Sequence, residues 1–340
     1  MIKYFVLYLK AKLECHPELV SLSKDVRNVM VRQAHHDTTM ITLRKFLEIN
    51  NTDKNLARLF TDAIAPAVIE IRHKIECGDL CHCGTENVYG EKQLALDVCS
   101  NQIVLDHLKK SGLVNIAASE ELESEVEFKK AGKDEKDLFT VVFDPLDGSS
   151  LVDVNFAVGS IFGVYPAGSP IGRTGDDQLA ACFAVYGPRT TLVLTLGKGT
   201  HEFRLNHKEN EFFLSKENLK ILPQAKYFAP GNLRAAAERD DYLKKIDEYI
   251  KKGMTLRYSG GMVPDINHIL IKGNGVFSYP SYSATPEGKL RLLFECNPMA
   301  LLVEQAGGGA IDEGGARILS KKITGLHTRT PIFIGSKSAL

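Results

Sequence analysis

Near its middle the chain reads LFTVVFDPLDGSS, residues 138–150. The first six residues are β-branched, aromatic or aliphatic, which is typical of a buried strand. Asp144-Pro145 then predicts that the strand stops in a turn. The stretch therefore predicts a core sheet with two carboxylates, Asp144 and Asp147, at the end of one of its strands.

Regular elements are expected on both sides of this strand. Apolar residues recur with a helical period over residues 53–76, where Pro66 predicts a kink or break, and over 91–110, which Ser111-Gly112 ends. The charged segment 121–137 is expected to be a surface loop. Further strands are expected at 114–119, 156–165, 180–186, 190–196, 202–205 and 211–214, and further helices at 233–250 and 298–306.

This order predicts a layered α/β or α+β fold in which helices alternate with mixed sheets. A soft boundary is expected near Leu222, which divides one continuous unit into residues 1–222 and 223–340. The glycine cluster at 307–315 follows a predicted helix and not a strand, so it does not indicate a dinucleotide-binding loop.

Composition excludes several classes of protein. The 340 residues hold 42 Lys+Arg and 42 Asp+Glu, and this balance argues against a general nucleic-acid binder. No apolar run reaches the roughly 18 residues of a membrane span. An odd number of cysteines, seven, does not indicate a secreted disulfide framework. The apolar hexamer between the lysines of residues 1–10 is shorter than the apolar region of a signal peptide, and no small-residue cleavage site follows. A cytoplasmic protein is therefore expected, or a plastid protein if a leader was removed.

Two carboxylates three residues apart indicate a site for a hard cation. Asp144 and Asp147, with the backbone carbonyl of Leu146 between them, supply the oxygen ligands that Mg²⁺ prefers. The small residues Gly148, Ser149 and Ser150 then offer free backbone N–H groups to a phosphate. The alternative is an ordinary Asp-Pro turn with a capping carboxylate.

Other carboxylates fit the same chemistry. Glu120 and Glu121 follow a strand-like run, and adjacent residues at a strand end point opposite ways, so one can hold metal while the other orients water. Asp97 lies between apolar residues of a predicted helix. Glu295 ends an apolar run, where a buried carboxylate needs a cation or hydrogen bonds. Taken alone, the Glu120-Glu121 pair is more typical of solvated charge and Asp97 of a capping or exposed aspartate, whereas Glu295 is the second metal candidate after the Asp144–Asp147 pair.

Together these segments resemble the fructose-1,6-bisphosphatase family over residues 55–335, and within it most closely the sedoheptulose-1,7-bisphosphate branch. The motifs that carry the resemblance are EKQLALD (91–97), SEE (119–121), DPLDGSS (144–150), GDDQ (175–178), YGPRTT (186–191), GTHEF (199–203), PGNLR (230–234), LRYSGGMVPD (256–265) and KLRLLFECNPM (289–299).

The resemblance implies a set of metal ligands and catalytic groups. About two or three Mg²⁺ ions, for which Mn²⁺ can substitute, would be held by the following groups: Glu120, Asp144, Asp147, Glu295 and the carbonyl of Leu146. Asp97 and Glu121 would position and deprotonate the attacking water, with Glu91 as a helper.

The resemblance also implies how substrate is bound. Gly148, Ser149 and Ser150 would contact the reacting phosphate, and Gly261 and Met262 the sugar. The distal phosphate would meet Asn232, Tyr258, Tyr279 and Lys289, with Arg257 reaching across from a neighbouring subunit of a homodimer or homotetramer.

The expected activity is Mg²⁺-dependent hydrolysis of the C1 phosphate of sedoheptulose 1,7-bisphosphate, in the Calvin cycle or the pentose phosphate route. The alternative is fructose 1,6-bisphosphate, alone or as a second substrate. One departure favours the sedoheptulose branch: residues 36–43 lack the glycine of an AMP-binding turn. A second departure concerns Asn232, because this chain lacks the tyrosine that the fructose enzymes carry three residues on.

Other functions stay open at this stage. An inositol-monophosphatase type shares the DPLDG signature, but it usually has a Trp-Asp pair where this chain has Phe294-Glu295. A metabolite-sensing protein on an inactive phosphatase scaffold is a non-enzymatic alternative. Cys77, Cys81 and Cys83 suggest a thiol switch, a zinc site with His73 or His82, or simply free thiols.

Overall fold

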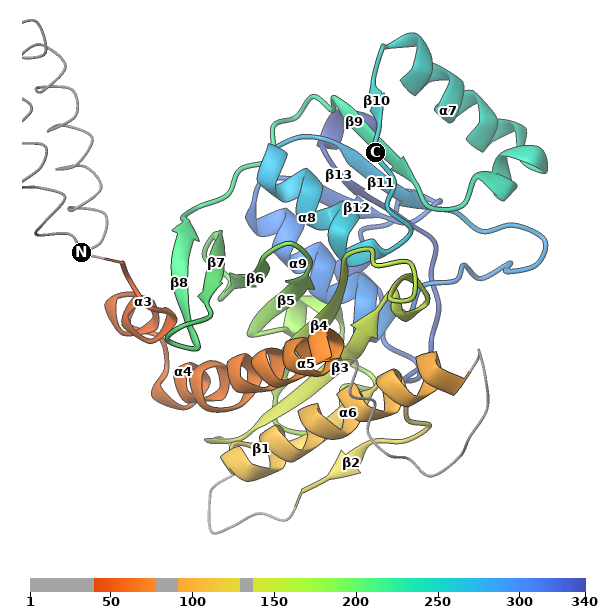
Figure 1. Cartoon of the computed structure of the whole chain (residues 1–340). Coiled ribbons are helices and arrows are strands. Elements are labelled where there is room, and N and C mark those ends of the chain that lie inside the picture. Colours follow the sequence, from red (N-terminus) through yellow and green to blue (C-terminus); the bar gives the residue numbers. More distant parts are fainter. Residues whose placement is uncertain (1–39, 78–90, 129–136) are drawn as a thin grey trace, which may run out of the picture. The chain divides into compact units, whose positions relative to one another are not determined.

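The structure is a computed structural model that describes residues 40–77, 91–128 and 137–340 (Figure 1). Residues Thr42–Leu340 form one compact unit, which is described here by itself. Two mixed sheets alternate with layers of helices, so the expected fold class is confirmed. In the described part of the chain, no helix has the length and apolar composition needed to cross a membrane.

The first sheet has eight strands in the order β2-β1-β3-β4-β5-β6-β7-β8. Only β1 and β3 pair in parallel, and all other neighbours are antiparallel. Its strands are β1 (Val114–Ser119), β2 (Val126–Glu127), β3 (Phe139–Asp147), β4 (Val158–Pro166), β5 (Ala180–Tyr186), β6 (Thr190–Thr195), β7 (Thr200–Asn206) and β8 (Glu211–Lys216).

The second sheet has five strands in the order β10-β9-β11-β13-β12. Strands β10, β9 and β11 are parallel to one another, and β13 and β12 continue the sheet in antiparallel pairs. These strands are short, which is why periodicity did not predict them: β9 (Tyr227–Pro230), β10 (Thr255–Leu256), β11 (Val276–Tyr279), β12 (Gly309–Ile311) and β13 (Ile332–Gly335).

Helices cover both sheets and separate them. Helix α6 packs on β1 and β3, and helices α8 and α9 lie between the two sheets in one large apolar core (Figure 1). Helix α7 packs against the outer face of the second sheet in a smaller core. The helices are α3 (Leu43–Ile49), α4 (Lys54–Leu59), α5 (Ala65–Cys77), α6 (Glu91–Ser111), α7 (Asp240–Lys251), α8 (Met262–Lys272) and α9 (Asn297–Gln305).

Strand β3 differs from the sequence prediction in a way that matters for the site. It does not stop at Asp144 but continues to Asp147, and all nine of its residues are buried. Its pairing with β4 is irregular between Asp144 and Asp147, because Pro145 has no N–H to donate. The Pro145 carbonyl instead accepts a 2.7 Å hydrogen bond from the Ser160 hydroxyl. Both carboxylates are therefore fixed on one buried strand.

Two helical predictions also need correction, and one helix was missed. Pro66 does not break its helix; a π-helical turn at Phe60–Ile64 precedes it and carries the irregularity in the hydrogen bonding. The predicted helix 233–250 is a short 3₁₀ segment, Leu233–Ala237, followed by α7, because Arg239 between them is extended. Helix α8 was not predicted at all.

Some expectations fall partly outside the described residues. The expected loop 121–137 contains β2, and its residues 129–136 are not described. Residues 36–39 of the segment 36–43 also lie outside, as do Cys81, His82 and Cys83. Cys77 has a free, exposed thiol, and its Sγ lies 3.5 Å from Nε2 of His73 one helical turn earlier.

Candidate active site

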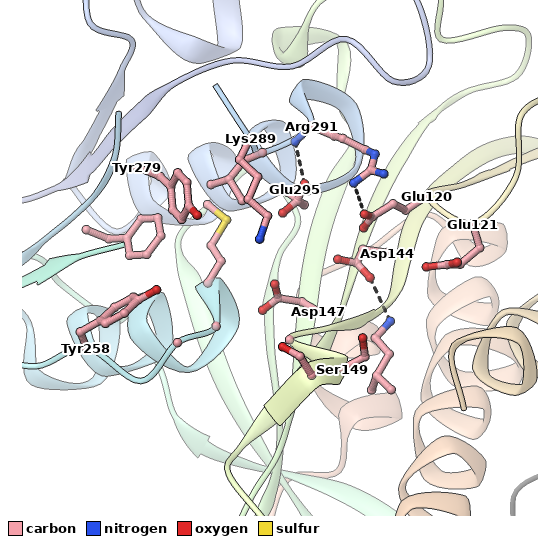
Figure 2. A pocket seen from close by; sticks show the side chains of 18 residues that line it. Glu120, Glu121, Asp144, Asp147, Ser149, Tyr258, Tyr279, Lys289, Arg291 and Glu295 are labelled. Atoms are coloured by element: carbon pink, nitrogen blue, oxygen red, sulfur yellow. Dashed lines mark hydrogen bonds and ion pairs between the residues drawn. The ribbon is translucent and has the colours of Figure 1, made fainter. Parts of the chain in front are cut away.

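A cavity of about 380 Å³ lies where the end of β3 meets the start of α8, the end of β11 and the segment before α9 (Figure 2). Carboxylates occupy one side of it, Tyr258 and Tyr279 the other, and Lys289 points into the space between. The predicted residues that line this cavity are Glu120, Glu121, Asp144, Leu146, Asp147, Gly148, Ser149, Ser150, Tyr258, Gly261, Met262, Tyr279, Lys289 and Glu295.

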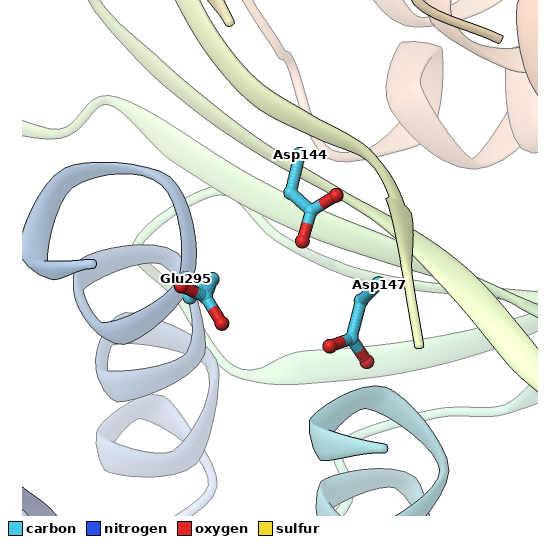
Figure 3. A group of neighbouring side chains, drawn as sticks. All are labelled: Asp144, Asp147 and Glu295. Carbon is cyan, nitrogen blue, oxygen red and sulfur yellow. The ribbon is translucent and has the colours of Figure 1, made fainter. Parts of the chain in front are cut away.

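Three buried carboxylates form the centre of the acidic side. Oxygens of Asp144, Asp147 and Glu295 all lie within 4.8 Å of one another (Figure 3). Asp144 and Asp147 come from β3, whereas Glu295 comes from a π-helical turn, Leu292–Cys296, just before α9. The turn therefore brings a carboxylate from far along the chain to the end of the strand.

Each of these carboxylates accepts one backbone hydrogen bond that fixes its direction. Asp144 accepts from its own strand, at Leu146 N (2.9 Å), and Glu295 accepts from Arg291 N (2.6 Å). Asp147 accepts from Val263 N in the first turn of α8 (2.7 Å), where the helix dipole favours a negative charge.

The cluster is electrostatically strained without a cation. Burial raises the pKa of Asp147 to about 6 and the pKa values of Asp144 and Glu295 well above their usual range. The negative charge of Glu120 raises all three further. Buried oxygen ligands that repel one another are what a divalent metal ion would neutralise, so the residues present fit a hard cation such as Mg²⁺.

Glu120 and Glu121 do not point opposite ways as expected, because β1 ends at Ser119 and both acids lie in the following turn. Both line the cavity. Glu120 forms an ion pair with Arg291, whose Nε lies 3.3 Å from His327 Nδ1. Sequence reasoning did not select Arg291, although it stands in the KLRLLFECNPM motif four residues before Glu295.

Asp97 lies on α6 beside this group but is not part of the cavity lining. Burial raises its pKa to about 7, and the charge of Glu121 adds to the rise. Its Oδ1 is buried with no hydrogen-bond partner among the described residues. Burial also raises the pKa of Glu121, as does the charge of Glu120. Glu91 begins α6, and its side chain lies outside the described part of the structure.

Asn232 and Arg257, which were predicted to bind substrate, do not line the cavity. Asn232 is buried, and its Nδ2 donates to the carbonyl of Pro280 (3.4 Å). Arg257 is exposed and donates to its neighbour's carbonyl, Leu256 O (2.9 Å). Asp265, in the first turn of α8, was not predicted as a site residue and does not line the cavity. Burial raises its pKa to about 7, and its Oδ1 accepts a hydrogen bond from Ser259 N (2.9 Å).

Comparison with known proteins gives this arrangement a family. The profile described as "Fructose-1-6-bisphosphatase, N-terminal domain" matches residues 38–217, and "Fructose-1-6-bisphosphatase, C-terminal domain" matches residues 221–340. The chain belongs to the fructose-1,6-bisphosphatase family. The resemblance drawn from the sequence is thus confirmed at the level of the family.

Relatives with two different names are similar to this member of the family. A "Fructose-1,6-bisphosphatase class 1" of Geobacter sulfurreducens is 46% identical over 299 residues, which cover 87% of this chain and 92% of the relative. A chloroplastic "Sedoheptulose-1,7-bisphosphatase" of Spinacia oleracea is 43% identical over 297 residues, covering 87% and 75%.

Solved structures that are similar to this chain also carry both names. The holo form of Leishmania major fructose-1,6-bisphosphatase has a TM-score of 0.79 at 33% identity, covering 88% of this chain and 97% of that one. A putative sedoheptulose-1,7 bisphosphatase from Toxoplasma gondii has a TM-score of 0.78 at 32% identity, covering 88% and 96%. The expected sedoheptulose branch is therefore not confirmed.

Proposed function

We propose that this protein hydrolyses the C1 phosphate of fructose 1,6-bisphosphate in a Mg²⁺-dependent reaction, with sedoheptulose 1,7-bisphosphate as a second substrate. The observation that carries the proposal is the two-sided cavity, which joins buried carboxylates to phosphate-binding donors. Fructose 1,6-bisphosphate stands first because the Geobacter relative at 46% identity bears that name.

Metal binding is assigned to the buried carboxylates. Asp144, Asp147 and Glu295, together with Glu120 and the Leu146 carbonyl, would hold Mg²⁺, and Mn²⁺ has the same ligand preference. Bound there, the metal would neutralise charge on the departing phosphate and lower the pKa of a coordinated water. The guanidinium of Arg291 also supplies positive charge to Glu120.

Asp97 and Glu121 are assigned to the attacking water. A base works best when its pKa lies near the working pH, and the pKa of Asp97 is about 7. Its buried Oδ1 has no hydrogen-bond partner among the described residues and can accept a proton. Glu121 lines the cavity next to Asp97 and would orient the same water, with Glu91 as a possible helper on α6.

The reacting phosphate is assigned to the turn after β3. Gly148 has a positive φ of 79°, a conformation that glycine adopts without strain, and the 3₁₀ segment Ser149–Leu151 follows directly. Gly148, Ser149 and Ser150 all line the cavity, so their backbone N–H groups would hold the phosphate beside the carboxylates.

The distal phosphate is assigned to the opposite side of the cavity. Tyr258, Tyr279 and Lys289 line it and supply hydroxyl and ammonium donors, while Gly261 and Met262 line the space for the sugar. We thus assign the metal and the reacting phosphate mainly to residues 1–222 and the sugar to residues 223–340, with Glu295 as the exception.

Oligomerisation and location belong to the same proposal. Arg257 is exposed and has no carboxylate partner among the described residues, which suits a role in a neighbouring subunit's site within a homodimer or homotetramer. Asn232 would support the distal site from behind, through the Pro280 carbonyl. We assign the enzyme to the cytoplasm, in keeping with the bacterial source of its Geobacter relative.

Sedoheptulose 1,7-bisphosphate is kept as a second substrate for a specific reason. Position 235, three residues after Asn232, holds a buried alanine where the resemblance to the fructose enzymes leads one to expect a tyrosine. The distal end of this site therefore lacks one aromatic hydroxyl, which leaves room for a different mode of phosphate binding.

The test is phosphate release from both bisphosphates, with Mg²⁺ and with EDTA. We expect turnover of both only with the metal, with kcat/KM for fructose 1,6-bisphosphate at least as high. Glu295→Gln should abolish turnover, whereas Asp153→Asn, an exposed aspartate in the loop before β4, should not. Binding of a bisphosphate without any turnover would instead show an inactive scaffold, and release of phosphate only from inositol monophosphate would show the other enzyme class.

A further inference from the structure

Three parallel strands of the second sheet end at the same edge. Leu256 of β10 is in register with Phe228 of β9, and Pro230 of β9 is in register with Ser278 of β11. Because parallel strands run in the same direction, the residues that follow them emerge side by side, and such edges are common ligand sites. The segments that follow the three strands there are 257–258, 231–234 and 280–282.

Arg234 is the cation of the middle segment. Its Nε donates to Asn232 Oδ1 (3.3 Å), and its guanidinium carbon lies 5.3 Å from the ring centroid of Tyr282. The side chain is exposed and has no carboxylate partner among the residues that the structure describes. Two contacts thus orient the guanidinium, and neither neutralises its charge, which leaves the planar group available to an anion.

Tyr258 connects Arg234 to the cavity. The Tyr258 hydroxyl donates to the carbonyl of Gly231 (3.0 Å), three residues before Arg234, and Tyr258 lines the cavity. Burial raises the pKa of the Tyr258 hydroxyl, while the charge of Arg234 works against that rise, so the two groups lie close enough to interact. Arg234 itself does not line the cavity, and Tyr258 is the lining residue that contacts its segment, at the Gly231 carbonyl.

Tyr279 and Lys289 are the other two donors on this side of the cavity. Tyr279 is 8% exposed, and Lys289 lies with its Nζ 5.9 Å from the ring centroid of Tyr279. The charge of Lys289 also acts on Asp147, at the acidic side. Lys289 lines the cavity and acts on Asp147, so it suits a phosphate close to the carboxylates, whereas Arg234 does not line the cavity and suits one that lies farther from them.

We propose that Arg234 determines substrate length, by binding the distal phosphate when the sugar has seven carbons instead of six. This rests on the proposed function, because it assumes that the C1 phosphate is anchored at the carboxylates. One additional carbon–carbon bond carries the distal phosphate about 1.5 Å farther from the C1 phosphate. There the guanidinium takes the place of the aromatic hydroxyl that Ala235 cannot supply.

The experiment compares Arg234→Ala with the unchanged protein on three substrates in Mg²⁺: sedoheptulose 1,7-bisphosphate, fructose 1,6-bisphosphate and fructose 1-phosphate. We expect KM for the seven-carbon bisphosphate to rise about tenfold with kcat nearly unchanged, since a binding contact is lost equally from ground state and transition state. The rise for fructose 1,6-bisphosphate should stay below about threefold, and fructose 1-phosphate, which has no distal phosphate, should be unaffected.

Two variants control this comparison. Arg204→Ala removes an exposed arginine of β7 in the other sheet and should change no KM. Arg234→Lys keeps the charge but loses the planar fork, so it should recover only part of the affinity for the seven-carbon substrate. Thermal unfolding confirms that each variant is folded.

Equal losses on both bisphosphates, or no loss on either, would overturn the assignment of Arg234. It would also be overturned if the unchanged protein hydrolysed fructose 1,6-bisphosphate but not sedoheptulose 1,7-bisphosphate, although its phosphatase activity would then stand. Failure of the unchanged protein on every substrate would refute the proposed function itself.

Discussion

Replacing Asp147 with asparagine should stabilise the metal-free protein and abolish its activity at the same time. Asp147 is 9% exposed, and burial raises its pKa from an ordinary value of 3.8 to about 6, with the charge of Glu120 contributing. An amide cannot ionise, so the substitution removes this cost. The hydrogen bond from Val263 N survives, because an amide oxygen accepts it as a carboxylate oxygen does.

The size of the stabilisation follows from the shift of the pKa. About two pKa units correspond to about 3 kcal/mol, or about 5 °C in Tm for a chain of this size. The folded-state pKa lies above the unfolded-state value, so the stability of the unchanged protein falls as pH rises through the interval from about 4 to about 6. The advantage of Asp147→Asn is therefore absent below about pH 4 and complete above about pH 6.

The assay is thermal unfolding in EDTA over pH 4 to 8, repeated in Mg²⁺, with phosphate release measured in parallel. Loss of one metal ligand should reduce kcat about a thousandfold and remove the rise in Tm that Mg²⁺ gives the unchanged protein. If Asp147→Asn were no more stable than the unchanged protein in EDTA at pH 8, or still released phosphate with Mg²⁺, the electrostatic reasoning would be wrong.

Asp312 provides a control, because its pKa is shifted in the direction opposite to that of Asp147. It lies outside the cavity and accepts hydrogen bonds from Lys321 Nζ (2.6 Å) and from two backbone N–H groups. Burial raises the pKa of Asp312, but these hydrogen bonds and the charge of Lys321 outweigh it and lower the pKa overall. Asp312→Asn should therefore destabilise the protein at pH 8 and leave phosphate release unchanged.

Three further predictions use the same two assays. If Asp97 accepts the proton of the attacking water, kcat/KM should rise with pH and reach a plateau above about pH 7. Asp97→Asn should remove this dependence of kcat/KM on pH. If the dependence were unchanged in Asp97→Asn, Asp97 would not be the base. Arg291→Gln removes the ion pair with Glu120 and should lower the free energy of unfolding in EDTA by about 1–3 kcal/mol. The loss should be smaller in Mg²⁺, because the metal ion would compensate the charge of Glu120. Equal losses in EDTA and in Mg²⁺ would contradict this. A Cβ on Gly231 would lie 2.4 Å from Cδ2 of Tyr279, so Gly231→Ala should displace the tyrosine ring. Because Tyr279 is assigned to binding the distal phosphate, KM should rise about tenfold. A fall in kcat with KM unchanged would contradict this assignment of Tyr279.

Much of the first sheet could be predicted from sequence because its strands are long and its signals are local. The strand at 180–186 matches β5, and the hairpin to β6 follows from Gly187-Pro188 between two apolar runs. Helix α6 ends where Gly112 adopts a positive φ of 61°, as the Ser-Gly stop predicted. In each case the deciding residues are neighbours in the chain.

The second sheet could not be predicted in the same way. Strand β10 has only two residues, and β9 and β11 have four each, so none shows a period that sequence analysis can detect. They exist because they pair with one another and because α8, α9 and α7 cover the two faces of the sheet. The edge that presents Arg234 is therefore a product of tertiary pairing.

The sequence by itself determined the residue types of the site: an Asp-Pro-Leu-Asp pair on a buried strand, acids after β1, and basic and aromatic donors toward the carboxyl terminus. Only the tertiary structure decided which of them meet. Arg291 pairs with Glu120 across 171 residues, and Glu295 reaches the end of β3 through a π turn. Local periodicity records contacts between near neighbours, whereas this cluster depends on packing between segments far apart in the chain, so its geometry and its raised pKa values are properties of the folded protein alone.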